Sequence, residues 1–278
     1  MALSQVHFLS EALARIVTFH IYLPNDTSCE FTDNNPNYER KTKTLYLLHG
    51  FHGNTTDWIT GSSAMEISRQ YNVAIVLPSG ENSFYLNRKG TGNAYETYIA
   101  RELPAYIKKT YNLSDDREDV SIGGLSMGGF GAIRLGAKYG EKYGAAFGLS
   151  SALIINEIAG LSPDNMEEFA LGIADYDYYV NVFGDLNKVK ESEVNPEYII
   201  RQRLKEGKNI SRIFMACGTE DALIENNRRF RNFLQSNKVS VTYYESPGIH
   251  DWKFWNEYLE RAVLWAISGE QECKRESF

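Results

Sequence analysis

Gly124-Leu125-Ser126-Met127-Gly128 lies between a strand-like run at residues 119–122 and a run of small residues with helical spacing at 128–138. A serine between two glycines, after a strand and before a helix, is typical of a sharp turn that projects the hydroxyl above a sheet. By composition, the pentapeptide would occur by chance in roughly one such chain in eight, so the flanking elements carry most of the weight. We therefore predict that Ser126 is a nucleophile; the alternative is a bystander serine in a glycine-rich turn.

Strand-like runs recur along the chain and alternate with helical patterns. They predict strands at residues 14–23, 44–48, 72–77, 119–122, 145–149, 212–216 and 239–245, and helices at 94–110, 128–138, 226–237 and 251–268. Short apolar strands that alternate with helices indicate an α/β fold with a mostly parallel central sheet flanked by helices. Residues 155–208 show no convincing strand, so we expect a lid-like helical insertion within a single domain spanning residues 1–278.

A serine hydroxyl needs a general base, and the chain has histidines at positions 7, 20, 49, 52 and 250. His250 follows a predicted strand and precedes the last helix, where the α/β-hydrolase fold places its base. The chain order of that fold, nucleophile, acid and then base, puts the acid between Ser126 and His250. Asp221, after the penultimate strand, is our choice; its neighbour Glu220 is the rival, because sequence alone does not show which side chain turns inward. Asp251 is interpreted as the N-cap of the final helix.

The stretch LHGFHG at residues 48–53 follows an early predicted strand. Its glycines let the backbone approach a ligand, and a loop at this position supplies one oxyanion donor in α/β-hydrolases. We predict that the N–H of Phe51 is this donor and that the N–H of Met127, at a helix start, is the other. His49 is interpreted as a structural histidine bonded to nearby backbone, whereas His52 either borders the substrate pocket or faces solvent.

Composition narrows the class of partner. The 278 residues are 43% hydrophobic and carry a net charge of −7 without any Lys/Arg-rich block, which disfavours nucleic acid and anionic membranes as partners. Three widely spaced cysteines suit neither a disulfide scaffold nor a zinc site. Neither a signal peptide nor a membrane helix is evident, so we expect a cytoplasmic protein. Its oligomeric state, homo-oligomer included, stays open.

Four motifs and an N-terminal pattern at residues 10–24 resemble the esterase D family, which includes S-formylglutathione hydrolases, feruloyl esterases and small tributyrin esterases. The motifs are LLHGFHGNTTDW (47–58), GGLSMGG (123–129), GTED (218–221) and GIHDW (248–252). The resemblance implies a triad of Ser126, Asp221 and His250, with an oxyanion hole formed by the N–H groups of Phe51 and Met127. The sequence departs from the family at His52, where related enzymes often have a smaller residue, and across residues 155–208, which vary widely in the family.

The expected activity is that of a serine carboxylic ester hydrolase acting on short-chain or aromatic acyl esters through an acyl-enzyme. This chemistry needs no metal and no organic cofactor. We expect His52 and Trp252 to contact the small-molecule ester. The alternatives are an S-formylglutathione-type thioesterase, a deacetylase or feruloyl esterase acting on acylated sugars, a peptidase or acyltransferase, and a non-catalytic binding module. The tyrosines of the acidic segment 174–179 either stack on the substrate or fill the core of the insertion.

Overall fold

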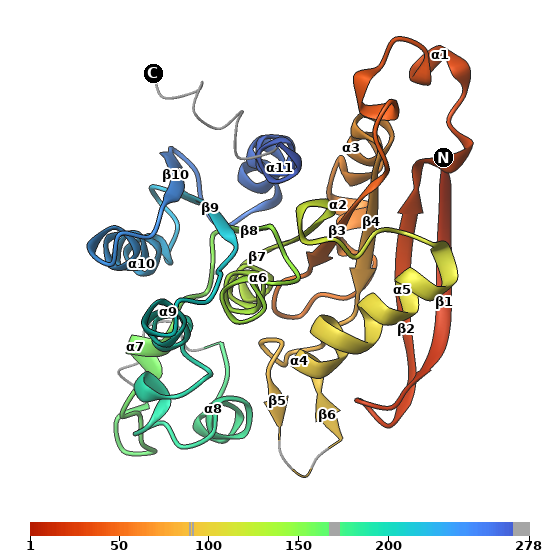
Figure 1. Cartoon of the computed structure of the whole chain (residues 1–278). Coiled ribbons are helices and arrows are strands. Elements are labelled where there is room, and N and C mark those ends of the chain that lie inside the picture. Colours follow the sequence, from red (N-terminus) through yellow and green to blue (C-terminus); the bar gives the residue numbers. More distant parts are fainter. Residues whose placement is uncertain (89, 91, 167–172, 269–278) are drawn as a thin grey trace.

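The computed structural model describes residues 1–88, 90, 92–166 and 173–268. An eight-stranded sheet has the order β1-β2-β4-β3-β7-β8-β9-β10 (Figure 1). Its strands are β1 (Ala2–Ser10), β2 (Arg15–Leu23), β3 (Lys43–Leu48), β4 (Val73–Pro78), β7 (Val120–Leu125), β8 (Ala145–Leu149), β9 (Arg212–Gly218) and β10 (Val241–Ser246). Pairing is parallel from β4 to β10, whereas β1 with β2 and β2 with β4 are antiparallel. The predicted α/β fold with a mostly parallel sheet is confirmed.

Helices cover both faces of this sheet (Figure 1). One face packs against α2 (Asp57–Gly61), α3 (Ala64–Tyr71) and α11 (Trp252–Ile267). The other packs against α4 (Tyr95–Thr97), a π-helical turn (Tyr98–Glu102), α5 (Leu103–Tyr111), α6 (Met127–Lys138) and α10 (Ile224–Ser236). Each face has its own cluster of buried apolar side chains, so both sides of the sheet are dry. No helix in the described ranges is both long enough and apolar enough to cross a membrane.

The parallel strands bring distant loops together at one edge of the sheet. Loops that follow β3, β7, β9 and β10 contain, in that order, residues 49–53, Ser126, Asp221 and His250. Because parallel strands all end at the same edge, these loops become neighbours, and this carboxyl edge is where open α/β sheets bind ligands.

Several elements of the fold were not predicted from the sequence, among them α1 (Cys29–Thr32) and the two-stranded sheet of β5 (Asn87–Arg88) and β6 (Asn93–Ala94). The edge strand β1 was missed because neither face of it is consistently apolar: Leu3 and Leu9 point to solvent, whereas Val6 and Phe8 pack partly against the core. The two short helices α2 and α3 between β3 and β4 were also missed. A short helix offers few turns over which an apolar period can show.

Residues 155–208 lie between β8 and β9. Their described part forms α7 (Ile155–Ile158), α8 (Tyr176–Phe183), a 3₁₀ turn (Val189–Glu191) and α9 (Pro196–Lys205), with no strand among these described residues. Tyr179 is fully buried and belongs to the larger apolar cluster, while the ring of Tyr178 packs edge-on against Phe51 at 5.5 Å. These two tyrosines therefore pack against the rest of the protein and not only within the insertion.

Candidate active site

Ser126 occupies a strained turn between β7 and α6. Its backbone has φ of 53° and ψ of −119°, a conformation that residues other than glycine rarely adopt. The N–H of Ser126 donates to the carbonyl of Leu149 at 2.9 Å, and its carbonyl accepts from the N–H of Ala152 at 2.9 Å. These bonds to the end of β8 and to the loop that follows it stabilise the strained conformation. Ser126 itself is half-buried.

The two glycines of the pentapeptide are required by close backbone contacts. A Cβ on Gly124 would lie 2.5 Å from the carbonyl carbon of Gly128 and 2.8 Å from the carbonyl oxygen of Leu48. A Cβ on Gly128 would lie 2.3 Å from that same oxygen. No side chain fits at either position, so the glycines allow β3 and the start of α6 to meet at Ser126.

The structure brings His250 and Asp221 into direct contact. The Nδ1 of His250 lies 2.8 Å from Oδ2 of Asp221, and the other carboxylate oxygen accepts the N–H of Leu223 at 2.8 Å. Glu220 turns the other way, because its Oε2 accepts the N–H of Gly248 at 2.6 Å. Of the two neighbouring acids, only Asp221 therefore contacts the imidazole in this structure.

Asp221 is held as an anion. Burial opposes its ionisation, since the residue is only 2% exposed, but the hydrogen bond and charge of His250 outweigh burial and lower the pKa of the carboxyl. The side chain of His250, in contrast, is about 36% exposed to solvent. A sealed carboxylate beside an accessible imidazole suits a pair in which the imidazole exchanges protons and the carboxylate stays charged.

The loop after β3 packs against the serine. A Cβ on Gly50 would lie 3.5 Å from the Cβ of Ser126, so the backbone leading to Phe51 passes beside the candidate nucleophile. Nearby His49 is 1% exposed, with Nδ1 2.7 Å from the carbonyl of Gly50 and Nε2 accepting the N–H of Gly80 at 2.8 Å. Burial lowers the pKa of His49, and both ring nitrogens are occupied by backbone, as expected for a structural histidine.

Ser126, Asp221 and His250 line one pocket of about 370 Å³. The remaining described lining residues are Gly50, Phe51, His52, Leu125, Ala152, Ile154, Ile173, Ala222, Leu223 and Trp255. We call this cavity the triad pocket. Apart from Ser126, Asp221 and the two histidines, its described lining residues are apolar or glycine, and none of them is a lysine or an arginine.

The two predicted substrate contacts lie in different places. His52 lines the triad pocket and is exposed at its rim. Trp252 is not among the described lining residues; its ring packs edge-on against Trp58 at 5.2 Å and against Trp255 at 5.2 Å. Trp255 reaches the pocket instead, with its ring 5.0 Å from that of His250.

Sequence reasoning missed Trp255 and the apolar walls formed by Ile154, Ile173 and Leu223. Trp255 lies one helical turn beyond Trp252, on the same apolar face of the last helix, so periodicity alone could not separate the two. Ile154 and Ile173 lie outside the predicted strands and helices, so the sequence did not show that they would face the pocket.

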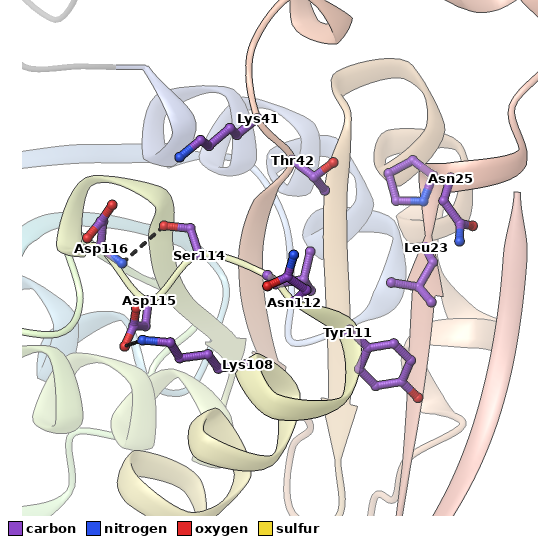
Figure 2. Close-up of a pocket in the computed structure, with 12 residues that line it drawn as sticks. Leu23, Asn25, Lys41, Thr42, Lys108, Tyr111, Asn112, Ser114, Asp115 and Asp116 are labelled. Carbon is purple, nitrogen blue, oxygen red and sulfur yellow. Dashed lines mark hydrogen bonds and ion pairs between the residues drawn. The ribbon is translucent and has the colours of Figure 1, made fainter.

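A larger pocket of about 620 Å³ lies elsewhere, between the C-terminal end of α5 and the segments that follow β2 and precede β3 (Figure 2). Its lining includes an ion pair between Lys108 and Asp115 at 2.6 Å, and Ser114, whose hydroxyl accepts the N–H of Asp116 at 3.1 Å. None of its described lining residues is a histidine, so Ser114 has no imidazole base there. The smaller triad pocket is therefore the candidate active site.

The chain is similar to known esterases in sequence and in fold. The model of the Esterase family ("Putative esterase") matches residues 10–266. An acetyl esterase from Caldicellulosiruptor saccharolyticus is 40% identical over 265 residues, which cover 95% of this chain and 98% of that protein.

Two solved structures from Staphylococcus aureus share the fold over 96% of this chain. Fluorophosphonate-binding serine hydrolase F, with substrate bound, has a TM-score of 0.82 at 26% identity and is covered to 99%. An S-formylglutathione hydrolase has a TM-score of 0.79 at 25% identity and is covered to 100%. With a family match over nearly its whole length and a 40% identical acetyl esterase, this chain belongs to the Esterase family and is a carboxylic ester hydrolase of the α/β-hydrolase fold.

Proposed function

We propose that the protein hydrolyses esters of short acyl chains through an acyl-enzyme on Ser126. In this proposal His250 is the general base, Asp221 orients it, and the backbone N–H groups of Phe51 and Met127 form the oxyanion hole. The observation that carries the proposal is the 2.8 Å contact between His250 and Asp221 in the pocket that also contains Ser126. A nucleophile, an accessible base and a buried orienting acid on one cavity are the parts that this chemistry needs.

The reaction has two halves. Nε2 of His250 takes the Ser126 proton as Oγ bonds to the ester carbonyl carbon, and the carbonyl oxygen becomes an anion facing the two N–H groups. The imidazolium then returns the proton to the leaving alkoxide, which departs as the alcohol. In the second half, His250 takes a proton from water, the hydroxide oxygen bonds to the acyl carbon, and the carboxylic acid leaves as Ser126 regains its proton.

The pocket walls favour a small, uncharged acyl ester. About 370 Å³ is near the lower end of ligand-pocket volumes. Ile154, Ile173 and Leu223 supply apolar surface suited to a short hydrocarbon chain. In this proposal residues 155–208 form a helical insertion in a single domain and contribute Ile173 as one wall of the pocket. The 40% identical relative is named as an acetyl esterase, and acetyl is the smallest acyl group that carries an alkyl carbon.

The thioester S-formylglutathione is the second candidate, because one structural relative carries that activity in its name. Glutathione has two carboxylates, and the described walls of the triad pocket offer neither lysine nor arginine to pair with them. A substrate panel should therefore give higher kcat/KM for acetyl and butyryl esters than for S-formylglutathione or feruloyl esters. A preference for S-formylglutathione would overturn the choice of substrate but leave the triad standing.

The triad itself is tested by Ser126→Ala, with Ser114→Ala of the larger pocket as the matched control. Loss of the nucleophile should lower kcat for p-nitrophenyl acetate by about 10⁵-fold or more, while the control keeps the parental rate. Circular dichroism and thermal melting would show that both variants fold. A Ser126→Ala variant that folds and keeps most of its turnover would refute the proposal.

A further inference from the structure

A fully buried serine follows β8 in a backbone conformation that serine rarely adopts. Ser150 has φ of 47° and is 0% exposed, and its N–H donates to the carbonyl of Ala216 on β9 at 2.8 Å. Left-handed backbone at a residue other than glycine is uncommon and is found disproportionately at functional sites. Glycine would fit this turn without strain, so the serine side chain itself needs an explanation.

The Ser150 hydroxyl lies between the last helix and the acid of the triad pocket. The indole Nε1 of Trp255 donates to Ser150 Oγ at 3.1 Å. An indole N–H is only a donor, so the Ser150 oxygen accepts this bond and its own proton must point elsewhere. After His250, the Ser150 hydroxyl is among the groups that lower the pKa of the Asp221 carboxyl, and the thiol of Cys217 is a second neighbour of this hydroxyl.

Trp255 completes a closed ring of contacts. Its indole stands perpendicular to the imidazole of His250, with ring centroids 5.0 Å apart and an interplanar angle of 89°. The indole is held from behind by Trp252, whose ring lies 5.2 Å away. His250 bonds to Asp221, Ser150 accepts the bond from Trp255, and Trp255 packs on His250. The fourth link is electrostatic, because the Ser150 hydroxyl contributes to the lowered pKa of Asp221.

We propose that Ser150 and Trp255 are positioning residues, which hold the Asp221 carboxylate and the His250 imidazole in the geometry that proton transfer needs. The Ser150 hydroxyl donates to Asp221, while the Trp255 indole fixes the direction of that hydroxyl and limits the tilt of the imidazole. This inference rests on the proposed roles of Ser126, Asp221 and His250. Neither positioning residue exchanges a proton with substrate.

The proposal predicts a shift in pH dependence that a purely structural role would not produce. Without the Ser150 hydroxyl, the Asp221 carboxylate loses a donor and attracts the proton of its remaining partner, His250, more strongly. The acid limb of the kcat/KM profile should then move to higher pH by about 0.5 to 1 unit. We expect kcat to fall about tenfold, with KM changing less than about twofold, because the buried hydroxyl does not face substrate.

The test compares Ser150→Ala with Ser150→Gly. Both remove the hydroxyl, but only glycine suits the positive φ, so equal losses of kcat assign the effect to the hydroxyl. Ser211→Ala is the matched control, because Ser211 is also a buried serine, with its hydroxyl bonded to the carbonyls of Gly136 and Tyr143. Its removal should lower stability and leave the acid limb in place.

A double-mutant cycle with Asp221→Asn shows whether the hydroxyl acts through the carboxylate. In the Asp221→Asn background, Ser150→Gly should cost less than about twofold in kcat. A parental kcat and acid limb in Ser150→Gly, or an undiminished tenfold loss in the Asp221→Asn background, would overturn the inference while leaving the triad intact. Failure of the triad itself would show separately, as retained activity in Ser126→Ala.

Discussion

Two buried carboxylates, Asp221 and Glu96, lie near opposite ends of helix α6 and pair with different kinds of side chain. At its N-terminal end, Ser126 lines the same pocket as the pair formed by His250 and Asp221. Towards its last turn, Arg134 and Lys138 extend from the helix to the buried carboxylate of Glu96. We call the first group the triad end and the second the ion-pair end.

At the ion-pair end the partners of the carboxylate are an arginine, a lysine and a tyrosine, residue types that do not change charge near neutral pH. Arg134 Nη2 lies 2.6 Å from Glu96 Oε2, Lys138 Nζ lies 2.7 Å from Oε1, and the hydroxyl of Tyr139 donates to Oε1 at 2.7 Å. Burial opposes ionisation of Glu96, but the charge of Arg134 and the hydrogen bond from Lys138 lower its pKa from 4.5 to about 2. The side chains of Arg134 and Glu96 are sealed from solvent.

At the triad end the buried carboxylate of Asp221 faces a histidine, whose charge can change near neutral pH, and this histidine is open to a cavity. A buried carboxylate with a lowered pKa is therefore not in itself a sign of catalysis. What separates the two ends is whether the partner can release a proton and whether a substrate can reach it. Changes at the triad end should lower activity, and changes at the ion-pair end should lower stability.

The largest effect is expected from Asp221→Asn, with Glu220→Gln as its matched control. The amide cannot stabilise the imidazolium, so kcat should fall by about 10⁴-fold while the free energy of unfolding changes little. The carboxylate of Glu220 accepts the N–H of Gly248, and the kcat of its amide variant should fall by less than about tenfold. Steady-state kinetics on p-nitrophenyl acetate would check both, and the reverse ranking would transfer the orienting role to Glu220.

The opposite pattern is expected from Glu96→Gln. Removing this carboxylate takes the ion-pair partner from the buried guanidinium of Arg134, whereas the partly exposed Lys138 keeps its pair with Glu193. The free energy of unfolding should fall by about 3 kcal/mol. Because α6 remains packed on both sides, kcat should stay within about twofold of the parent. Urea denaturation and kinetics on the same preparation would measure the two quantities, and a selective loss of kcat at unchanged stability would break the distinction between the two ends.

A smaller and more gradual effect is expected from acid. The pKa of Glu96 is about 2 in the folded chain and 4.5 as its ordinary value, so the unfolded chain binds more protons between these pH values. The stabilisation from Glu96 is thus complete above about pH 5 and is lost as the pH falls towards 2. The slope of unfolding free energy against pH in this window should be shallower in Glu96→Gln, and equal slopes would show that other carboxylates account for acid unfolding.

Much of the triad end could be predicted from sequence because its residues are fixed by chain order. The pentapeptide at Ser126, the loop acid Asp221 and His250 each follow a recognisable strand, and parallel strands must deliver such loops to one edge. The choice between Asp221 and Glu220 needed the structure. Adjacent residues in a loop have similar sequence surroundings, and only the path of the backbone decides which carboxylate faces the imidazole.

The ion-pair end and the roles of the positioning residues could not be predicted from the local sequence. Glu96 and Arg134 are 38 positions apart, and nothing in a helical charge pattern shows that one is buried against the other. Ser150 directly follows an apolar strand, and nothing in the local sequence indicates its positive φ or its bond to Ala216 on β9. Long-range burial of polar groups follows from tertiary packing, which a single sequence does not reveal.

The most direct test of the central claim is covalent labelling with a fluorophosphonate probe followed by peptide mass spectrometry. The account predicts one phosphonyl group per chain, carried by Ser126, with labelling slowed strongly in Asp221→Asn and unaffected in Glu96→Gln and Ser114→Ala. Labelling at another residue, or equal labelling of Ser126→Ala, would contradict the assignment of Ser126 as the nucleophile.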